Sequence, residues 1–206
     1  MPTKRSGRPR IIHFGATDNS ARKIGHRAKR NPEFDFVEIN CEGLKRAHLP
    51  KPNPTNVLEV KNDFLIGLRK EKDGSIPIMR SDMTLGYYGK AKRTVSSHHK
   101  KIVFWSTHPK DHEIISYTAD VLTLAYQKLR KNGVMTITVS DSPRYGTIGY
   151  RNVIDALHVS PFDPEKATIR PLTQKEADAS DLWVRKAFRA TKKEEGTTAW
   201  HITLRK

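Results

Sequence analysis

The sequence predicts an α/β fold with a doubly wound, mostly parallel sheet and a C-terminal antiparallel hairpin. Five short apolar segments alternate with stretches of helical spacing, and two further segments near the C-terminus are joined by the turn KKEEG. Strands that alternate with helices favour right-handed crossovers and a parallel sheet. A chain of 206 residues holds one sizeable α/β domain. We therefore expect a flexible basic arm over residues 1–9 and a single domain over residues 10–206.

The predicted strands are short runs that are either apolar throughout or alternate apolar with polar residues. In chain order the five strands are RIIHFG (10–15), FDFVEIN (34–40), IPIMRSD (76–82), KIVFWS (101–106) and VMTITVSD (134–141). KIVFWS is continuously apolar, which is typical of a strand buried on both faces. The two hairpin strands are expected at DLWVRKAFRAT (181–191) and TAWHITLRK (198–206).

Helices are predicted where apolar residues recur at helical spacing after a capping residue. They are expected from Asp18 or Ser20 to about Arg30, from Thr55 or Asn56 through Leu68, from about Asp111 to Arg130, and from Tyr150 to Leu157. The second of these follows HLPKPNPTN, in which three prolines predict a loop. The third ends at Asn132-Gly133, a helix stop signal.

The charge of the chain indicates a polyanionic partner. Lys and Arg number 38 against 22 Asp and Glu, a formal net charge of +16 at pH 7. Such an excess attracts nucleic acid. An acidic membrane surface is disfavoured because the basic residues are spread along the chain and not gathered on one amphipathic helix. The arm carries SGRPR, which resembles a minor-groove hook, and is otherwise expected to touch phosphates without specificity.

The single cysteine and the hydropathy pattern set the expected compartment. Cys41 alone excludes an internal disulfide and a cysteine-based zinc cluster. No apolar run approaches the roughly 18 to 20 residues that cross a bilayer. We therefore expect a soluble, cytoplasmic protein with no membrane partner. His98-His99 lack nearby carboxylates or cysteines, so no metal is expected.

The order of the predicted elements resembles the class I S-adenosylmethionine-dependent methyltransferases, which have a Rossmann-like fold. Four segments resemble, more narrowly, the tRNA (guanine-N7)-methyltransferases. They are PEFDFVEINCEG, WSTHPK in place of a Pro-Asp-Pro-Trp-Pro-Lys segment, the Asp-x-x-x-Tyr spacing of 141–145, and RPLTQKE at 170–176. The resemblance implies S-adenosylmethionine as cofactor and RNA, most simply tRNA, as partner.

The resemblance also implies roles for individual residues. The cofactor would be contacted by Gly15, Thr17, Glu38, Asp82, Met83 and Ser106. The substrate would be contacted by Lys110, Arg144, Tyr145, Arg170 and Thr173. Asp141 and Glu176 are the candidate catalytic residues, because a carboxylate can orient guanine by accepting from its N1–H and exocyclic amine. Guanine N7 carries a lone pair and no proton, so the transfer depends mainly on in-line positioning.

The sequence departs from the family at the cofactor turn. His13 stands where an acidic residue is usual, Thr17 and Asn19 stand where further glycines are usual, and Ser106 replaces an aspartate. These departures keep a second hypothesis open, a catalytically weak or inactive methyltransferase-like protein that binds RNA within a larger assembly. Methylation of an exocyclic amine of DNA is a third reading, but the Asn/Asp-Pro-Pro-aromatic motif of that class is missing after KIVFWS.

Overall fold

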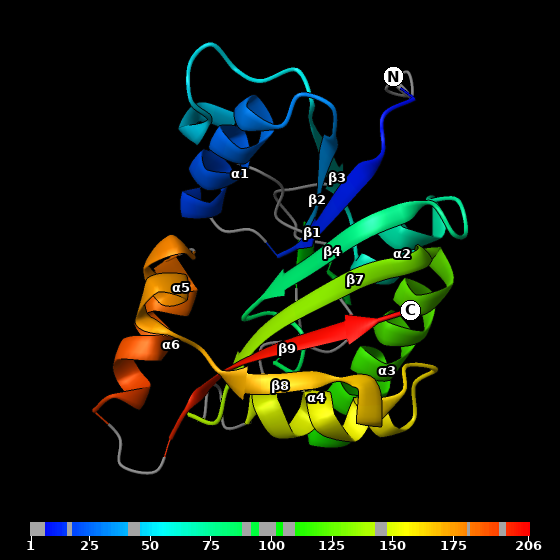
Figure 1. The fold of residues 1–206 in the computed structure, drawn as a ribbon, viewed down its shortest axis with the longest axis vertical. Coiled ribbons are helices and arrows are strands. Elements are labelled where there is room, and N and C mark those ends of the chain that lie inside the picture. The colour runs from blue at the N-terminus through cyan, green and yellow to red at the C-terminus, as the bar shows by residue number, and fades with distance from the viewer. Residues whose placement is uncertain are drawn as a thin grey trace.

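A computed structural model describes most of the chain. The residues that it describes are 7–15, 18–40, 46–87, 92–94, 102–104, 110–142, 148–180, 182–193 and 197–206. They form a seven-stranded sheet with helices on both sides (Figure 1). A separate ribbon of two strands accompanies this sheet.

The main sheet has the strand order β3-β2-β1-β4-β7-β9-β8. Its strands are β1 (Arg10–Phe14), β2 (Asp35–Asn40), β3 (Val57–Lys61), β4 (Ile76–Asp82), β7 (Leu129–Ser140), β8 (Thr168–Pro171) and β9 (Ala199–Arg205). The first five strands in this order are parallel, and β9 runs antiparallel to both β7 and β8. The predicted fold class, a mostly parallel sheet with antiparallel strands at the C-terminal edge, is confirmed.

Six helices among the described residues flank the sheet. They are α1 (Asp18–Arg30), α2 (Phe64–Arg69), α3 (Asp111–Lys128), α4 (Gly149–His158), α5 (Gln174–Ala179) and α6 (Leu182–Thr191), with 3₁₀ turns at η1 (Arg46–His48) and η2 (Pro164–Lys166). Figure 1 shows α1, α5 and α6 to the left of the sheet and α2, α3 and α4 to the right and below. No helix in the described part of the chain is long and apolar enough to cross a membrane.

Two apolar clusters hold the helices against the sheet. The larger contains the apolar side chains of β1, β4, β7 and β9 together with α2, α3 and α4. The smaller joins α1 to β2 and β3 through Ala21, Ile24, Ala28, Phe36 and Val57. At roughly 25 cal/mol per Å² of buried apolar surface, these clusters are the main favourable term in folding.

The two faces of the sheet differ in polarity. On the face toward α3 and α4, the side chains Met79, Met135, Ile137, Ile202 and Leu204 are at most 1% exposed. The opposite face carries polar side chains on the alternate positions of the same strands. Arg80, Thr136, His201 and Thr203 are all half-buried there. Strand alternation alone produces this contrast, because successive side chains point to opposite faces.

The segment expected to be a helix through Leu68 contains a strand. Val57–Lys61 forms β3, paired with β2 in parallel, and the helix α2 begins only at Phe64. Asp63 caps α2 by accepting from the amide of Leu65. The prediction was wrong because the apolar residues of VLEVK fit the spacing of a strand as well as that of a helix. The β-branched valines of this segment favour a strand beside β2. IPIMRSD is consequently the fourth strand of the sheet and not the third.

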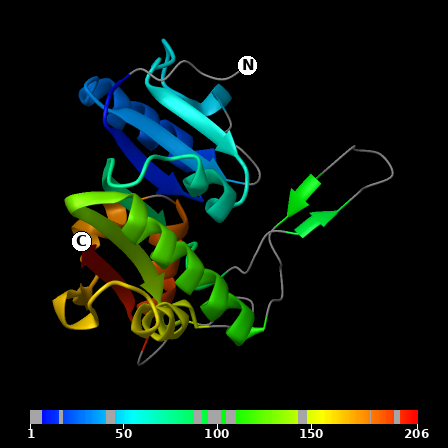
Figure 2. The same ribbon diagram turned by 90° about the vertical axis from the view of Figure 1, so that its right-hand side faces the viewer.

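Two further predicted strands lie elsewhere or are helical. Ile102–Phe104, within KIVFWS, forms β6 and pairs only with β5 (Lys92–Thr94) in the separate ribbon. Figure 2 shows this ribbon projecting from the body of the molecule. DLWVRKAFRAT was predicted as a strand, but Leu182–Thr191 is the helix α6, and the partner of β9 is β8.

Candidate functional site

The candidate site lies where the parallel strands end. The carboxyl ends of β1, β2, β4 and β7 meet at one edge of the sheet, and in open α/β sheets ligands bind beyond this edge. Phe14, Asn40, Asp82 and Ser140 are the last residues of these strands. The helix α1 follows β1 after one glycine turn. The side chains of this rim therefore define what the site can bind.

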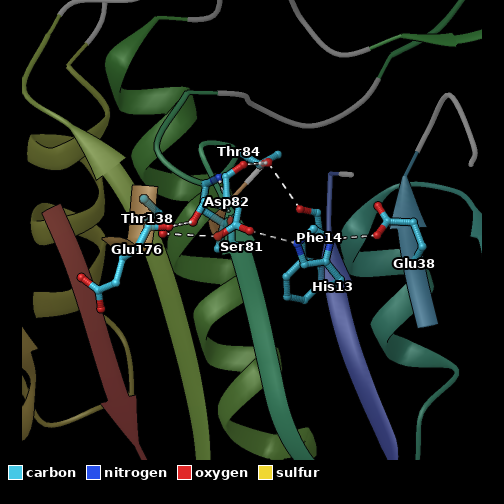
Figure 3. Close-up of polar contacts among 10 residues, drawn as sticks. His13, Phe14, Glu38, Ser81, Asp82, Thr84, Thr138 and Glu176 are labelled. Carbon is cyan, nitrogen blue, oxygen red and sulfur yellow. Dashed lines mark hydrogen bonds and ion pairs between the residues drawn. The ribbon is translucent and has the colours of Figure 1, made fainter. Parts of the chain in front are cut away.

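A buried histidine joins two carboxylates across three strands (Figure 3). The Nδ1 atom of His13 lies 2.8 Å from Oε2 of Glu38, and its Nε2 atom lies 3.3 Å from Oδ2 of Asp82. His13 is 6% exposed and Glu38 is 0% exposed. As an imidazolium the ring donates to both carboxylates at once, so His13 fixes the positions of both.

The two carboxylates keep His13 protonated. Burial by itself lowers the pKa of His13, but the charges of Glu38 and Asp82 and their hydrogen bonds outweigh it and raise that pKa to about 10. Burial likewise opposes ionisation of Asp82, yet the hydrogen bond and charge of His13, with help from Arg27 and Arg80, bring its pKa to about 2. The pair is therefore an internal ion pair at neutral pH.

A row of polar side chains extends from Asp82 toward the edge of the sheet. Asp82 is in register with Thr138, Thr138 with His201, and His201 with Arg170. The hydroxyl of Thr138 donates to Oδ1 of Asp82 at 3.3 Å. Neighbouring strands lie about 4.8 Å apart, so the row spans roughly 14 Å. Burial lowers the pKa of His201, and the nearby Arg170 lowers it further, which favours the neutral ring.

The segment RPLTQKE folds back on itself at the end of this row. Two guanidinium nitrogens of Arg170 donate to the carboxylate of Glu176 at 2.8 and 2.5 Å. Thr173 caps α5 and its hydroxyl donates to the same carboxylate. The bond to Arg170 holds the pKa of Glu176 far below its usual range. The amide of Thr173 also donates to this carboxylate, at 3.0 Å. Glu176 therefore already accepts about the four hydrogen bonds that a carboxylate can take, and a ligand would have to replace one of them.

The turn after β1 contains Gly15, the glycine that was expected to contact the cofactor. Gly15 has φ +73°, and a Cβ atom there would lie 2.3 Å from Oγ1 of Thr84. The hydroxyl of Thr84 in turn donates to the carbonyl of Asp82 at 3.0 Å. A side chain at position 15 is therefore excluded by both conformation and space. Met83, beside Asp82, also has positive φ, at 55°.

Asp141, the other candidate catalytic residue, follows β7 at the same rim. Its Oδ2 accepts from the indole N–H of Trp200 at 2.7 Å, and Trp200 stacks on Tyr150 with ring centroids 4.9 Å apart. This hydrogen bond orients the Trp200 ring, so Asp141 has a structural role in addition to its proposed role toward the substrate. Lys110 is exposed at the start of α3, where its amide donates to Glu113.

The structure revises how the candidate residues are grouped. Asp82 was expected to contact the cofactor from the end of IPIMRSD, the third predicted strand. That strand is β4, the fourth in chain order, and Asn62 and Asp63 follow the third strand, β3. Thr17, Ser106, Arg144 and Tyr145 lie outside the described residues. The structure brings Glu38 and Asp82 together through His13, and joins Arg170, Thr173 and Glu176 in a second group.

Sequence reasoning missed four residues of the rim. His13 was interpreted as a lost carboxylate, and Arg80, Thr138 and His201 were not singled out. The available signal was alternation, because R-x-D in β4, T-x-T-x-S in β7 and H-x-T in β9 place polar residues on every second position of strands that are otherwise apolar. Read together, these three patterns predict one shared polar face.

Comparisons with known proteins agree on the fold. No family model and no curated protein matches the sequence. One similar structure is the geranyl diphosphate C-methyltransferase of Streptomyces coelicolor in complex with S-adenosyl-L-homocysteine, at 9% identity over 97% of this chain and 71% of that chain, TM-score 0.55. Another is a variant of the 16S rRNA (adenine(1408)-N(1))-methyltransferase of Catenulisporales acidiphilia with S-adenosylmethionine, at 14% identity over 96% and 84% of the two chains, TM-score 0.55.

The fold of this chain is therefore that of the class I S-adenosylmethionine-dependent methyltransferases. The likeness includes an enzyme that acts on RNA and one that acts on a small diphosphate. At identities this low the likeness concerns the fold, and function must be argued from the site itself.

Proposed function

We propose that the protein is an S-adenosylmethionine-dependent RNA methyltransferase that acts on guanine N7 of tRNA or of a related structured RNA. One observation carries the proposal most directly. The sheet order β3-β2-β1-β4-β7-β9-β8 gathers Gly15, Glu38, Asp82 and the Arg170–Glu176 pair at or beside one rim, although they are far apart in the sequence. The net charge of +16 supports a nucleic-acid substrate.

Several features of the rim fit S-adenosylmethionine, and one feature, the burial of Glu38, does not. Gly15 lets the backbone approach a ligand closely, and the turn leads into α1, whose amino end favours negative charge. Asn62 and Asp63 follow β3, where an adenosine would lie. Glu38, however, is fully buried against His13. To reach the ribose hydroxyls its second oxygen must become accessible, so we expect modest cofactor affinity.

In the proposed reaction S-adenosylmethionine supplies an electrophilic methyl group. The N7 lone pair would accept this methyl group, and the sulfur would keep the electron pair of the broken carbon–sulfur bond. The protein abstracts no proton, so its residues bind, align and exclude water. Glu176 is the first candidate to accept from the Watson–Crick edge of guanine, for which guanine would have to replace one of the donors of Arg170 or Thr173. Asp141 is the second candidate for this role.

A second function is favoured by the burial of Glu38. A methyltransferase-like domain that has lost cofactor binding would keep the sheet and the basic surface and hold RNA without transfer. The imidazolium of His13 then serves only to neutralise the buried Glu38 and the half-buried Asp82, which is a structural role.

Calorimetric titration with S-adenosyl-L-homocysteine separates the two functions. Micromolar binding, together with transfer of a labelled methyl group from S-adenosylmethionine to tRNA, supports the enzyme. No heat at millimolar ligand refutes it and leaves the RNA-binding protein. An Asp141→Asn or Glu176→Gln variant that methylates RNA at the wild-type rate would remove that residue from the catalytic role.

A further inference from the structure

Two arginines, one on β4 and one on α1, bring positive charge to the polar face of the sheet. Arg80 lies on β4 in register with His13 and Thr136, and Arg27 lies in the last turn of α1. Both side chains are half-buried. In the described part of the chain neither guanidinium forms a hydrogen bond or ion pair with another residue.

Arg10 and Lys128 are cations of low exposure that do have carboxylate partners, whereas the Nε atom of the half-buried Arg185 is buried without a hydrogen-bond partner. Arg10 donates to both oxygens of Glu71 at 2.7 and 2.9 Å, and Lys128 lies 2.5 Å from Asp73. A guanidinium is costly to remove from water unless it is paired. Arg27 and Arg80 are candidates for a ligand site because their two guanidinium groups, unpaired among the described residues, act on the same carboxylate, that of Asp82.

Arg27 and Arg80 lie close enough to repel each other. Burial lowers the pKa of Arg80, and the charge of Arg27 lowers it further, whereas Asp82 only partly compensates. Asp82 and Glu38 share the His13 imidazolium between them. Three cations thus face two carboxylates in this part of the molecule, and the local field favours an anion.

The neighbouring side chains supply neutral hydrogen-bonding groups. Thr136, Thr203 and Thr168 follow Arg80 in register across three strands of the same face, and the next row contributes Thr138 and His201. In Figure 1 no helix of the described chain crosses in front of β4, β7 and β9. The side chains of Arg80, Thr136 and Thr203 on this face are half-buried and not fully buried, although α6 also contacts β7 and β9.

We propose that Arg27 and Arg80 bind a phosphodiester group of the RNA on this polar face, beside the Asp82 rim. The inference rests on the proposed RNA-binding function and deepens it, because it names where the backbone next to the target nucleotide lies. Guanidinium groups match phosphate with paired, charge-assisted hydrogen bonds. The threonine hydroxyls of the row donate to the same backbone, as hydroxyls commonly do in such interfaces.

The test compares two double variants with the same loss of charge. Arg27→Gln with Arg80→Gln removes the proposed site. Arg69→Gln with Arg130→Gln is the matched control, since both residues are exposed, on α2 and near the amino end of β7. Binding of a fluorescent tRNA transcript is measured between about 50 and 200 mM salt.

We expect the site variant to lose about tenfold or more in affinity at low salt, as expected for charge-assisted hydrogen bonds. Its slope of log K against log salt should become shallower by about one, close to one released phosphate contact. The control should change less than about threefold, because a distant surface charge contributes only diffuse attraction. Equal losses of affinity and slope in both variants overturn the proposal.

Three further measurements distinguish the proposed RNA contact from a small-anion site, from unfolding of the variant, and from failure of the proposed function. In the first, inorganic phosphate is added and the melting temperatures of the wild type and the site variant are compared. If phosphate raises only that of the wild type, and the site variant still binds RNA like the wild type, the site binds a small anion and the RNA proposal is overturned. If the double variant unfolds, Arg27→Gln alone and Arg80→Lys are measured in its place, and wild-type RNA binding in both overturns it. Wild-type protein that binds tRNA through this site but transfers no methyl group contradicts only the proposed function.

Discussion

At the scale of single residues, His13 decides how the rim is organised. A carboxylate at this position would have faced Glu38 and Asp82 with a third negative charge in a buried place. The imidazolium bridges the two instead, at 2.8 and 3.3 Å. Whichever proposed function holds, His13 is therefore a positioning residue for both carboxylates and not simply the absence of an acidic side chain.

The protonation of His13 predicts a pH dependence of stability. Its pKa of about 10 in the folded protein exceeds its unfolded value, so its contribution is complete below about pH 6.5 and is lost as pH rises through 10. Asp82, with a folded pKa of about 2, contributes fully above about pH 3.9 and loses its contribution below. The free energy of unfolding should therefore fall between about pH 6.5 and pH 10.

Urea denaturation of His13→Gln checks this dependence. At about pH 6 we expect a loss of about 3 to 5 kcal/mol, since a broken buried pair leaves carboxylates uncompensated. The loss should shrink toward alkaline pH. His26→Gln, at an exposed position of α1, is the control and should change little. A His13→Gln loss that is the same at every pH would contradict the ion pair.

At the scale of secondary-structure elements, one tyrosine fastens the segment after β4 to the end of β7. The hydroxyl of Tyr87 accepts from the amide of Ser140 at 2.9 Å and donates to its carbonyl at 3.1 Å. The ring packs on Gly149, where a Cβ atom would come within 2.2 Å of it. The ends of β4 and β7 and the start of α4 are thus held together beneath the rim.

Tyr87→Phe should lower the free energy of unfolding by about 1 to 3 kcal/mol, because it leaves the Ser140 amide buried without its partner. The urea midpoint measures this loss. Tyr126→Phe, at a half-buried position of α3, should change stability by less than about 0.5 kcal/mol. Similar losses in the two variants would argue against a special role for the Tyr87 hydroxyl.

At the scale of the whole molecule, the charge of +16 is distributed over helices, loops and the N-terminal segment. It predicts RNA binding that weakens steeply with salt, whichever of the two functions holds. Within this diffuse field, Arg27 and Arg80 are distinguished by the effect of both of their charges on Asp82 at the rim.

Deletion of residues 1–6 tests the predicted arm. It removes Lys4 and Arg5 and should make the salt slope of RNA binding shallower by about one to two. Stability should not change, because the deletion keeps Pro9, whose carbonyl accepts from the amide of Asp35 at 3.0 Å. An unchanged salt slope would exclude the arm from phosphate contact, and a lower urea midpoint would show that it supports the fold.

The sequence alone determined the alternation of strands and helices, the basic character of the chain, and the placement of Gly15, Glu38 and Asp82 at strand ends. These follow from local periodicity and composition, which need no knowledge of neighbours. Only the tertiary structure decided that Val57–Lys61 is a strand, that Leu182–Thr191 is a helix, and that Ile102–Phe104 leaves the main sheet. The apolar residues of a short segment fit the spacing of a helix as well as that of a strand, so the packing partner decides which of the two forms. The bridge of His13 and the row from Asp82 to Arg170 likewise depend on strand register, which contacts between distant segments set.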